Sequence, residues 1–379
     1  MKDLKWKKTT VAILFLMAAL HGQSQSNDLT TKRPPRSMDD LDIFSMIQPI
    51  PPTNMFRDSL YNIWCGSVIQ AKNGKYYMFY ARWPRAEGHY AWVNRSEIAL
   101  AVSDRPGGPY KHIKTVLQSR GNQYWDGASM HNPYVILYKG KYYLYYMGTT
   151  GKSTLAKPIT MKDPNWWEYR NNQRIGVAVA TDPEGDWQRF DKPVLDISPD
   201  STAIDGMMVS NPAATFNDKG KVLLIYKCVG KNGTLKGGKV RFRAAFADSP
   251  IGPFIKDPAP VFSFNDPKTA DVNMLAEDPY IWYNDGVYYA IVRDVVGYFN
   301  KGKSTLALLR STDGIDWRAA KHPAVAPYRL RYSDGSLSDD QIERPWLLIE
   351  HGTPVILFGA MGINKREHAM NIAVPLKSN

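Results

Sequence analysis

Carboxylates stand at two kinds of position in this sequence where acid–base chemistry could be performed. Glu277 and Glu343 each lie just before an apolar and aromatic stretch, as in EDPYIWYNDGVYY from Glu277. Asp126 and Asp205 each precede a Gly and lie seven residues ahead of a Pro in a comparable stretch. Many hydrolytic reactions use two such groups, one as acid and one as base. Asp126 or Asp205 is the candidate base, and Glu277 is a further candidate for this chemistry.

Each acid also has a structural interpretation that the sequence leaves open. An Asp before Gly commonly shapes a turn by accepting hydrogen bonds from nearby backbone N–H groups. Acids recur at nearly the same place in two further repeats, at Asp58 and Asp271, and this recurrence favours a scaffold role. Glu277 could simply open a strand, and Arg344 could neutralise Glu343.

Five copies of one pattern must position these residues. Each copy has a polar start, usually a Pro, an apolar run, a Gly-containing turn and an aromatic strand, which predicts two strands joined by a hairpin. The copies begin at Trp64, His131, Ser210, Glu277 and Glu343. Their common position recurs at spacings of 67, 79, 67 and 66 residues, and is occupied by Gly66, Pro133, Pro212, Pro279 and Pro345.

A second pattern adds two strands to most copies. It reads IALAVSDRPGGPY, VAVATDPEGDW, RAAFADSPIGPF and ALLRSTDGIDW. Four strands in each of five repeats predict an all-β fold, a five-bladed β-propeller with almost no helix. The fifth copy lacks the second pattern, so any fourth strand there must come from the segment that precedes the first blade.

These strand pairs and Ser-Asp…Gly-Pro-aromatic turns resemble glycoside hydrolase family 43 and its five-bladed relatives, families 32, 117 and 130. The resemblance covers nearly the whole chain after the N-terminal segment, and it implies a glycosidase. It places Glu277 where the family has its general-acid Glu. The family's blade-one and blade-three Asp residues are absent, because Cys65-Gly66-Ser67 and Ser210-Asn211-Pro212 stand in their places. The family's mechanism therefore cannot be carried over whole.

The innermost strands of a propeller begin near its axis, so their first residues should surround one cavity. His131 could there bind substrate, act as an acid, orient a metal, or be an ordinary buried polar residue. Two long insertions, residues 82–97 and 151–174, should bring aromatic and Arg side chains to the rim. The candidate substrate contacts are Trp64, His131, Arg82, Trp125, Arg293, Glu343 and Arg344.

The N-terminus has the features of a secretory signal peptide. Four Lys residues precede the uncharged apolar run 10–20, and small and polar residues follow, with cleavage expected near Ser24. We divide the chain into a signal peptide (1–24), an irregular lead-in (25–57) and one propeller domain (58–379). The protein is expected to be secreted or periplasmic, without a membrane span.

Composition narrows the partners. The formal charge is +12, but Lys and Arg are scattered and form no nucleic-acid module, so we expect no nucleic-acid partner. Cys65 and Cys228 are too few for a disulfide framework, although they could pair. No metal-ligand spacing is present, so no metal site is predicted and no cofactor is required; a central calcium or sodium ion could still be bound.

Three functions remain open from the sequence. The first is a glycoside hydrolase, inverting, with Glu277 as general acid. The second is a phosphorylase that uses phosphate in place of water, and the third is an inactive carbohydrate-binding propeller. Aromatic side chains suit sugar faces and Arg side chains suit acid groups, which favours an anionic carbohydrate, uronic or sulfated.

Overall fold

Twenty strands form five four-stranded antiparallel sheets in the computed structural model, which describes residues 38–263, 269, 271–363 and 368–377. The first blade contains β2 (Tyr61–Gln70), β3 (Tyr76–Pro84), β4 (Glu97–Ser103) and β5 (Lys111–Leu117). The second contains β6 (Ser129–Tyr138), β7 (Lys141–Thr149), β8 (Arg174–Ala180) and β9 (Gln188–Arg189). The third contains β10 (Met208–Phe216), β11 (Val222–Val229), β12 (Val240–Ala247) and β13 (Ile255–Val261).

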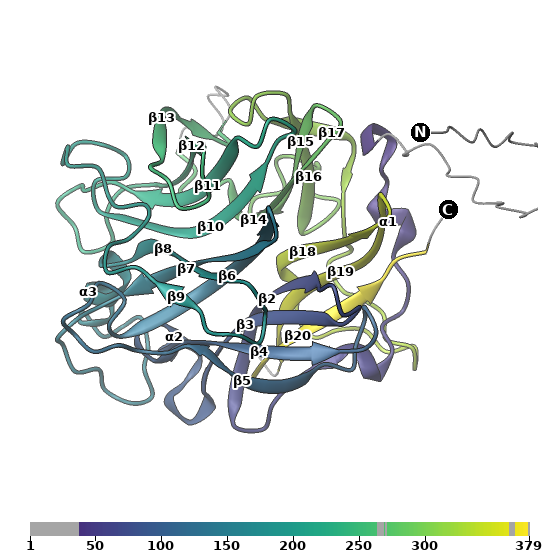
Figure 1. Cartoon of the computed structure of the whole chain (residues 1–379), viewed down its shortest axis with the longest axis horizontal. Coiled ribbons are helices and arrows are strands. Elements are labelled where there is room, and N and C mark those ends of the chain that lie inside the picture. The colour runs from purple at the N-terminus through teal and green to yellow at the C-terminus, as the bar shows by residue number, and fades with distance from the viewer. Residues whose placement is uncertain (1–37, 264–268, 270, 364–367, 378–379) are drawn as a thin grey trace, which may run out of the picture. The chain divides into compact units, whose positions relative to one another are not determined.

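The last two blades complete the circle. The fourth contains β14 (Ala276–Asn284), β15 (Val287–Asp294), β16 (Leu306–Ser311) and β17 (Arg318–Ala324). The fifth contains β1 (Met55–Phe56), β18 (Glu343–Glu350), β19 (Thr353–Ile363) and β20 (His368–Pro375). In Figure 1 the five sheets surround one centre, with β2, β6, β10, β14 and β18 innermost. The predicted five-bladed β-propeller is confirmed.

The described helices are short and lie in the connections. The α-helices are α1 (Ile43–Met46), α2 (Trp92–Arg95) and α3 (Trp166–Asn171). The 3₁₀ turns are Met38–Asp40, Pro52–Asn54, Arg85–Glu87 and His89–Ala91. Both long insertions predicted from the sequence therefore fold into short helical segments, α2 in the first blade and α3 in the second.

The fifth blade is closed by a strand from the N-terminal segment, as the sequence predicted. β1 pairs antiparallel with β20, with Met55 opposite Ile372 and Phe56 opposite Asn371. This pairing joins the two ends of the described chain in one sheet and covers an edge that would otherwise present unpaired backbone groups. Part of the lead-in predicted for residues 25–57 thus belongs to a blade. The signal peptide predicted for residues 1–24 lies outside the described residues.

Glycine sets the hairpin that joins the two inner strands of every blade. Equivalent glycines take φ angles between 77° and 79° at Gly74, Gly140, Gly220, Gly286 and Gly352. A side chain disfavours this left-handed conformation, which the tight turn between antiparallel strands requires. The five Gly-containing hairpin turns of the sequence therefore determine where the second strand of each blade begins.

A second repeated device turns side chains toward the axis. In each innermost strand the pairing register shifts at a bulge, one residue before the repeated Gly or Pro. That residue has a positive φ of 47–58° in every blade, at Cys65, Asn132, Asn211, Asp278 and Arg344. A non-glycine residue pays about 1–2 kcal/mol for this conformation, so its fivefold recurrence must be stabilised by contacts at the axis.

The propeller axis is closed below this bulge by aromatic side chains. The ring centroids of Tyr134 and Tyr280 each lie 4.8 Å from that of Trp346. Trp346 Nε1 donates to the carbonyl oxygen of Val68 at 2.8 Å, and Tyr134 Oη donates to that of Ile281 at 2.9 Å. These bonds link different blades, so the aromatic cluster both fills the axis and ties the blades together.

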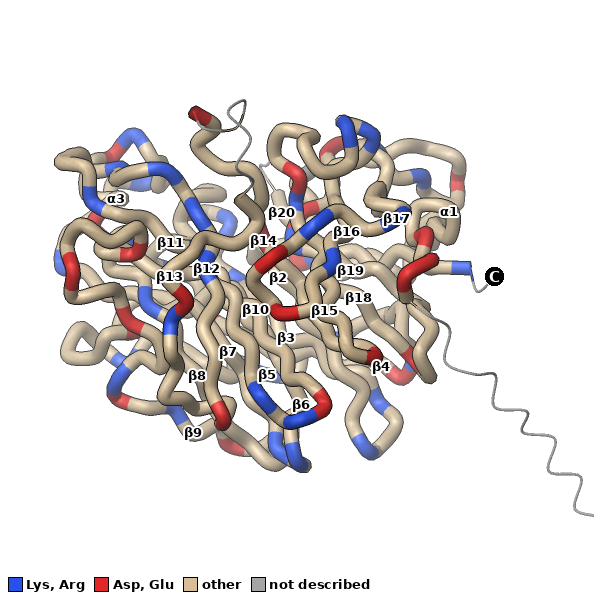
Figure 2. The backbone as a smooth tube through the Cα atoms, turned by 90° about the horizontal axis from the view of Figure 1, so that it is seen from above, with Lys and Arg blue, Asp and Glu red and all other residues tan. Residues whose placement is uncertain are grey.

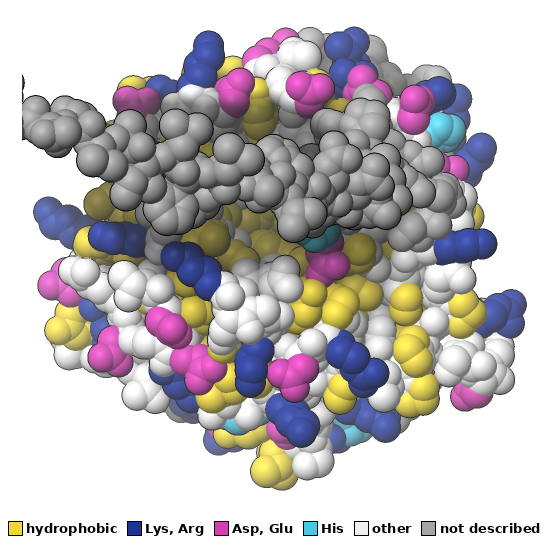
Figure 3. All heavy atoms as spheres, turned by 45° about the vertical axis from the view of Figure 1, so that its right-hand side comes forward, with side chains coloured by type: hydrophobic (Ala, Val, Ile, Leu, Met, Phe, Trp, Pro, Cys, Tyr) yellow, Lys and Arg dark blue, Asp and Glu magenta, His cyan; other side chains and the backbone are white. Residues whose placement is uncertain are grey.

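Charged groups are distributed over the surface without segregation. In Figure 2 the Lys and Arg positions and the Asp and Glu positions are both scattered over the backbone, and on the face in Figure 3 the two signs are intermixed. Cys65 and Cys228 are both buried free thiols, so they do not form the disulfide that the sequence left open. Among the described residues, no helix has the length and apolar character needed to cross a membrane.

Candidate active site

A cavity of about 360 Å³ opens at the propeller axis above the bulges. Its volume lies within the range usual for small-molecule sites. Six of the sequence-predicted site residues line it: Trp64, His131, Glu277, Arg293, Glu343 and Arg344. The bulged residues and the aromatic cluster lie beneath, around a much smaller space of about 30 Å³. The site is therefore a pocket with a closed floor.

Aromatic side chains from the first two blades form one wall of the cavity. Its members are Trp64, Trp83, His89, Tyr90, Trp92, Trp166 and Trp167. The two insertions support each other, because Trp166 Nε1 donates to the carbonyl oxygen of Tyr90 at 3.1 Å and the Ile159 N–H donates to that of Glu87 at 2.8 Å. The wall is thus held by loops that the long insertions supply, and aromatic faces of this kind suit the C–H faces of sugar rings.

Charged side chains from the other blades form the opposite wall. They are Lys227, Glu277, Asp278, Arg293, Glu343 and Arg344. Glu277 accepts from Lys227 Nζ and from Arg293 Nη1, each at 2.8 Å. Arg293 also reaches Glu343 with Nη2 at 3.4 Å, so one guanidinium bridges two carboxylates. The second carboxylate that Glu277 needs therefore lies beside it, on the neighbouring blade.

The five bulged residues form a hydrogen-bonded belt around the axis. Asn132 Nδ2 donates to Asn211 Oδ1 at 2.7 Å, and Asn211 Nδ2 donates to Asp278 Oδ1 at 2.9 Å. Arg344 Nη1 lies 3.0 Å from the same Asp278 oxygen. At the other end, the Cys65 thiol donates to Asn132 Oδ1 at 3.1 Å. Side chains from all five blades thus meet here, which explains how the positive φ angles are stabilised.

Glu277 and Asp278 are neighbours in the chain but have opposite electrostatic environments. Burial by itself would raise the pKa of Glu277, but Lys227 and Arg293 lower it to about 2. Burial raises the pKa of Asp278 to about 7, with a contribution from the charge of Glu277 and against the effect of Arg344. Near neutral pH, Glu277 is ionised while Asp278 can hold a proton. The neighbours of Glu277 are therefore cationic, and not the apolar or anionic groups that a raised pKa would need.

His131 is a neutral ring fixed between two partners. Ser96 Oγ lies 2.8 Å from its Nδ1, and the Trp92 ring stacks on it with a centroid distance of 5.1 Å. Burial lowers the pKa of His131 well below its usual value. Burial also raises the pKa of the Cys65 thiol, which stays protonated and cannot replace the missing base. His131 can therefore donate or accept a hydrogen bond in the cavity without carrying charge.

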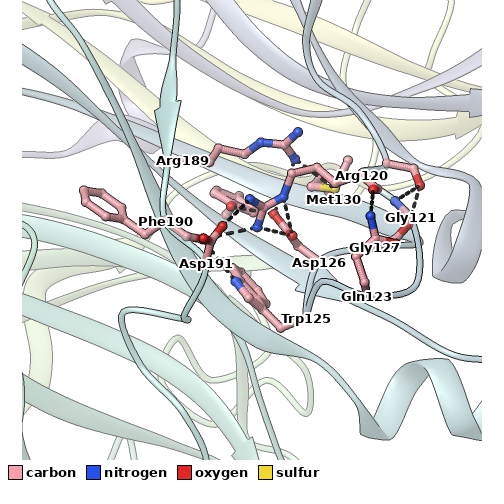
Figure 4. Close-up of polar contacts among 12 residues, drawn as sticks. Arg120, Gly121, Gln123, Trp125, Asp126, Gly127, Met130, Arg189, Phe190 and Asp191 are labelled. Atoms are coloured by element: carbon pink, nitrogen blue, oxygen red, sulfur yellow. Dashed lines mark hydrogen bonds and ion pairs between the residues drawn. The ribbon is translucent and has the colours of Figure 1, made fainter.

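Asp126 does not reach this cavity, which corrects its prediction as a base. It is fully buried at the outer side of the second blade, where Arg120 donates to Oδ1 through Nε at 2.9 Å and through Nη2 at 2.7 Å. Tyr146 Oη donates to Oδ2 at 2.8 Å, and Arg189 lies 3.4 Å away. Figure 4 shows Arg120 set against Asp126. These partners occupy both carboxylate oxygens, so Asp126 holds the blade together.

Asp205 repeats this arrangement in the third blade, and the same correction applies. It is fully buried, and it pairs with Arg243 at 2.8 Å and with Lys256 at 2.7 Å. Tyr226 Oη donates to its Oδ2 at 3.2 Å. Asp126 and Asp205 thus each form a clamp of one Asp, one Tyr and two cations, which is the scaffold role that their repetition favoured.

Two predicted substrate contacts also lie elsewhere. Trp125 stacks on Tyr146 at a centroid distance of 5.6 Å, and its ring fills the space that a side chain at Gly148 or Gly176 would need. Arg82 pairs with Glu97 at 2.7 Å and covers the Tyr61 ring. Both side chains point into their own blade. Arg344, which the sequence set beside Glu343, lies 3.0 Å from Asp278, and the charges of both acids raise its pKa.

The axis offers little to a metal ion. Within the described ranges, no group of three or more His, Cys, Asp or Glu side chains is arranged to bind one. The belt supplies a single carboxylate, and the guanidinium of Arg344 already pairs with it. Calcium prefers six to eight oxygen ligands. The belt therefore supplies too few carboxylate oxygens for a central calcium ion, and the sodium ion that the sequence left open stays a prediction.

Sequence reasoning missed Asp278 as a separate acid and Gln173 and Met208 as lining residues. The position of Asp278 in the repeat could have identified it from the sequence. It is the only carboxylate among the five residues that precede the repeated Gly or Pro, where the other four blades have Cys65, Asn132, Asn211 and Arg344.

Comparison with known sequences gives one short match. No protein-family model matches the chain. A stretch of 68 residues, 18% of the chain, is 38% identical to an extracellular endo-α-(1→5)-L-arabinanase of Thermotoga petrophila. The match spans only about 13% of that relative's length.

Solved structures resemble the chain over most of its length. One is a family 117 glycoside hydrolase of Zobellia galactanivorans, with a TM-score of 0.57 and 18% identity over 88% of this chain and 91% of that one. Another is an endo-arabinase of Bacteroides thetaiotaomicron, with a TM-score of 0.53 and 13% identity over 86% and 98%. A family 43 enzyme of Xanthomonas citri gives 0.54 and 15% over 86% and 91%. The protein shares the five-bladed fold of these glycoside hydrolases, which confirms the predicted resemblance.

Proposed function

We propose that the protein is a glycoside hydrolase that acts in the axial cavity. The observation that carries this proposal is the meeting of three carboxyl side chains and an aromatic wall in one pocket with a closed floor. Hydrolysis of a glycosidic bond uses carboxyl groups as acid and base, and aromatic faces hold the sugar. The likeness in fold to glycoside hydrolases supports the same reaction class.

The closed floor favours a substrate that enters by one end. Tyr134, Tyr280 and Trp346 block the axis below the belt, so a long glycan cannot pass through the propeller. The cavity of about 360 Å³ suits one or two sugar units. We therefore propose an enzyme that acts on chain ends or on short oligosaccharides.

The carboxyl groups divide into acid and base by their environments. The sequence assigned the acid to Glu277, which would require Lys227 or Arg293 to leave it when substrate binds. Asp278 binds Arg344 and Asn211 through Oδ1, and its pKa of about 7 lets it hold a proton near neutral pH. We assign proton donation to Asp278 and stabilisation of the oxocarbenium-like transition state to the ionised Glu277.

Glu343 is the remaining carboxylate of the cavity, and we assign to it the activation of water. Water is then the attacking group, and the configuration of the sugar is inverted.

Two other functions fit the cavity less well. A phosphorylase needs cations that bind phosphate beside the catalytic carboxyl groups, where Lys227 and Arg293 already pair with Glu277. A binding module without turnover needs no buried carboxyl with a raised pKa.

Export through the predicted signal peptide is part of the proposal, since polysaccharide fragments occur outside the cytoplasm. The support for export is the sequence of residues 1–24.

The proposal is tested by assaying sugar release from a panel of oligosaccharides, with and without phosphate. We expect reducing sugar to be released without phosphate, and Glu277→Gln to lower the rate by at least about 100-fold. Asp58→Asn is the matched control, because Asp58 is exposed and lies outside the cavity. Binding without turnover across the panel, or release of a sugar phosphate, would contradict the proposal.

A further inference from the structure

Arg170 is the cation of the cavity that has no carboxylate partner. Four cationic side chains line the described cavity, together with three carboxyl side chains. Lys227 and Arg293 pair with Glu277, and Arg344 pairs with Asp278. Within the part of the chain that the structure describes, Arg170 forms no ion pair, and its guanidinium bonds only the side chain of Asn171 and the carbonyl oxygen of Lys236.

The surroundings of Arg170 confirm that its charge is uncompensated. Burial lowers the pKa of Arg170 to about 10, and no neighbouring carboxylate acts against this effect. The contrast is with Arg293 and Arg344, whose pKa values nearby carboxylates raise. A half-buried guanidinium that has lost water without gaining a counter-charge is a favourable partner for an anion.

The guanidinium is also held in a fixed place. Arg170 lies on α3, and its carbon Cζ stands 5.6 Å from the centroid of the Trp167 ring. Its Nη1 donates to Asn171 Oδ1 at 3.1 Å and to the Lys236 carbonyl oxygen at 3.2 Å. Asn171 Nδ2 in turn donates to the carbonyl oxygen of Leu235 at 2.9 Å, which ties α3 to the third blade. Nε and Nη2 are left as the donors available to a ligand.

We infer that Arg170 binds an acid group, a carboxylate or a sulfate, on a sugar unit held against the aromatic wall of the cavity. This inference rests on the proposed carbohydrate site and names the substrate class of that site. The planar fork of Arg matches the two oxygens of a carboxylate or sulfate, and the aromatic wall orients the ring that carries them. The paired cations of the opposite wall are committed to Glu277 and Asp278, so the specificity for an acid group is carried by the insertion of the second blade.

The test is calorimetric binding with two pairs of probes. One pair is trigalacturonic acid and its methyl ester, and the other is a sulfated galacto-oligosaccharide and its unsulfated form. The wild-type protein should prefer one acidic probe over its neutral partner. Arg170→Met should reduce binding of that acidic probe by about 10- to 100-fold and leave the neutral partner unchanged, since a hydrogen bond to a charged group is worth 1.5–3 kcal/mol, or about one to two powers of ten.

Two variants serve as controls. Arg170→Lys keeps the charge but loses the fork, and should recover part of the affinity. Arg105→Met removes the same charge from an exposed turn outside the cavity, and should bind as the wild type does. A preference for trigalacturonic acid over its methyl ester would identify the group as a carboxylate. A preference for the sulfated over the unsulfated oligosaccharide would identify it as a sulfate.

The inference is overturned if neither acidic probe binds more tightly than its neutral partner, or if Arg170→Met keeps the wild-type preference. Its failure is distinguishable from failure of the hydrolase proposal, because the same titrations are repeated in the Asp278→Asn background, where we expect turnover to be removed. Preferential binding without hydrolysis would contradict the hydrolase and support Arg170, whereas hydrolysis without preference would do the reverse.

Discussion

Two sets of buried carboxylates in this protein look alike in their partners and differ in their place. Asp126 and Asp205 lie at the flanks of blades, and each pairs with two cations and a Tyr. Glu277, Asp278 and Glu343 lie at the axis, pair with cations as well, and face a cavity. Cationic partners alone therefore do not mark a functional carboxylate.

What separates the two sets is repetition. The flank clamps recur with the same spacing in adjacent blades, because each blade has the same packing problem to solve. The axial positions carry four residue types in five blades, Cys65, Asn132 and Asn211, Asp278, and Arg344. In a repeat fold, similar residues at equivalent positions indicate a shared scaffold, and dissimilar residues at equivalent positions indicate the site.

The largest expected effect is loss of stability when a flank clamp is broken. Asp126→Ala leaves Arg120 and Arg189 without their buried counter-charge, which should lower the free energy of unfolding by about 3–5 kcal/mol. Urea unfolding measures the change. Asp58→Ala, at the equivalent but exposed position of the first blade, should cost about 1 kcal/mol or less, since it removes only turn hydrogen bonds. Equal losses in both variants would contradict the clamp.

A smaller effect is expected in the pH dependence of stability. The folded protein raises the pKa of Asp278 from 3.8 to about 7, so it binds this proton more tightly than the unfolded chain. Stability should therefore fall as the pH rises from about 4 to 7. The pKa of Glu277 is lowered from 4.5 to about 2. Its contribution to the free energy of unfolding should therefore increase as the pH rises from about 2 to 4.5.

Asp278→Asn isolates this effect. The variant cannot lose the proton, so its free energy of unfolding should decline less than that of the wild type between pH 4 and 7. Urea unfolding at several pH values gives both curves. Identical pH dependence in the two proteins would show that Asp278 titrates normally.

The smallest effect on carbohydrate binding is expected at Arg82, a predicted substrate contact that lies away from the cavity. Arg82→Met removes a pair with Glu97 inside the first blade and should leave carbohydrate binding unchanged. Trp64→Ala removes part of the aromatic wall and should weaken binding about tenfold or more. Calorimetry on both variants compares the blade interior with the cavity. Weakened binding in Arg82→Met would place substrate outside the axial pocket.

Much of the fold was accessible from the sequence because its signals are local. The hairpin glycines, the alternating strands and the missing fourth strand of the last copy follow from turn chemistry and counting, and Gly74, Gly140 and their equivalents behave as predicted. The inner ring of Trp64, His131, Glu277 and Glu343 followed from where innermost strands begin.

The rest of the site depends on orientation, which the sequence does not carry. Asp126 faces the blade flank and not the axis because it binds Arg120 and Tyr146. Arg120 lies in the loop between β5 and β6, and Tyr146 lies on β7. The pairing of Arg344 with Asp278 depends on a bulge at positive φ, a conformation that the residue types Cys65 and Arg344 do not predict.

The most direct test of the account is the dependence of Asp278→Asn on the leaving group. The assay compares a natural oligosaccharide with a dinitrophenyl glycoside of the same released sugar, which needs no protonation to depart. A general acid contributes about 10²- to 10⁴-fold, so the variant should lose that much on the oligosaccharide and nearly nothing on the dinitrophenyl glycoside. Equal losses on both substrates, or this leaving-group pattern in Glu277→Gln instead, would contradict the assignment of Asp278 as the proton donor at the axis.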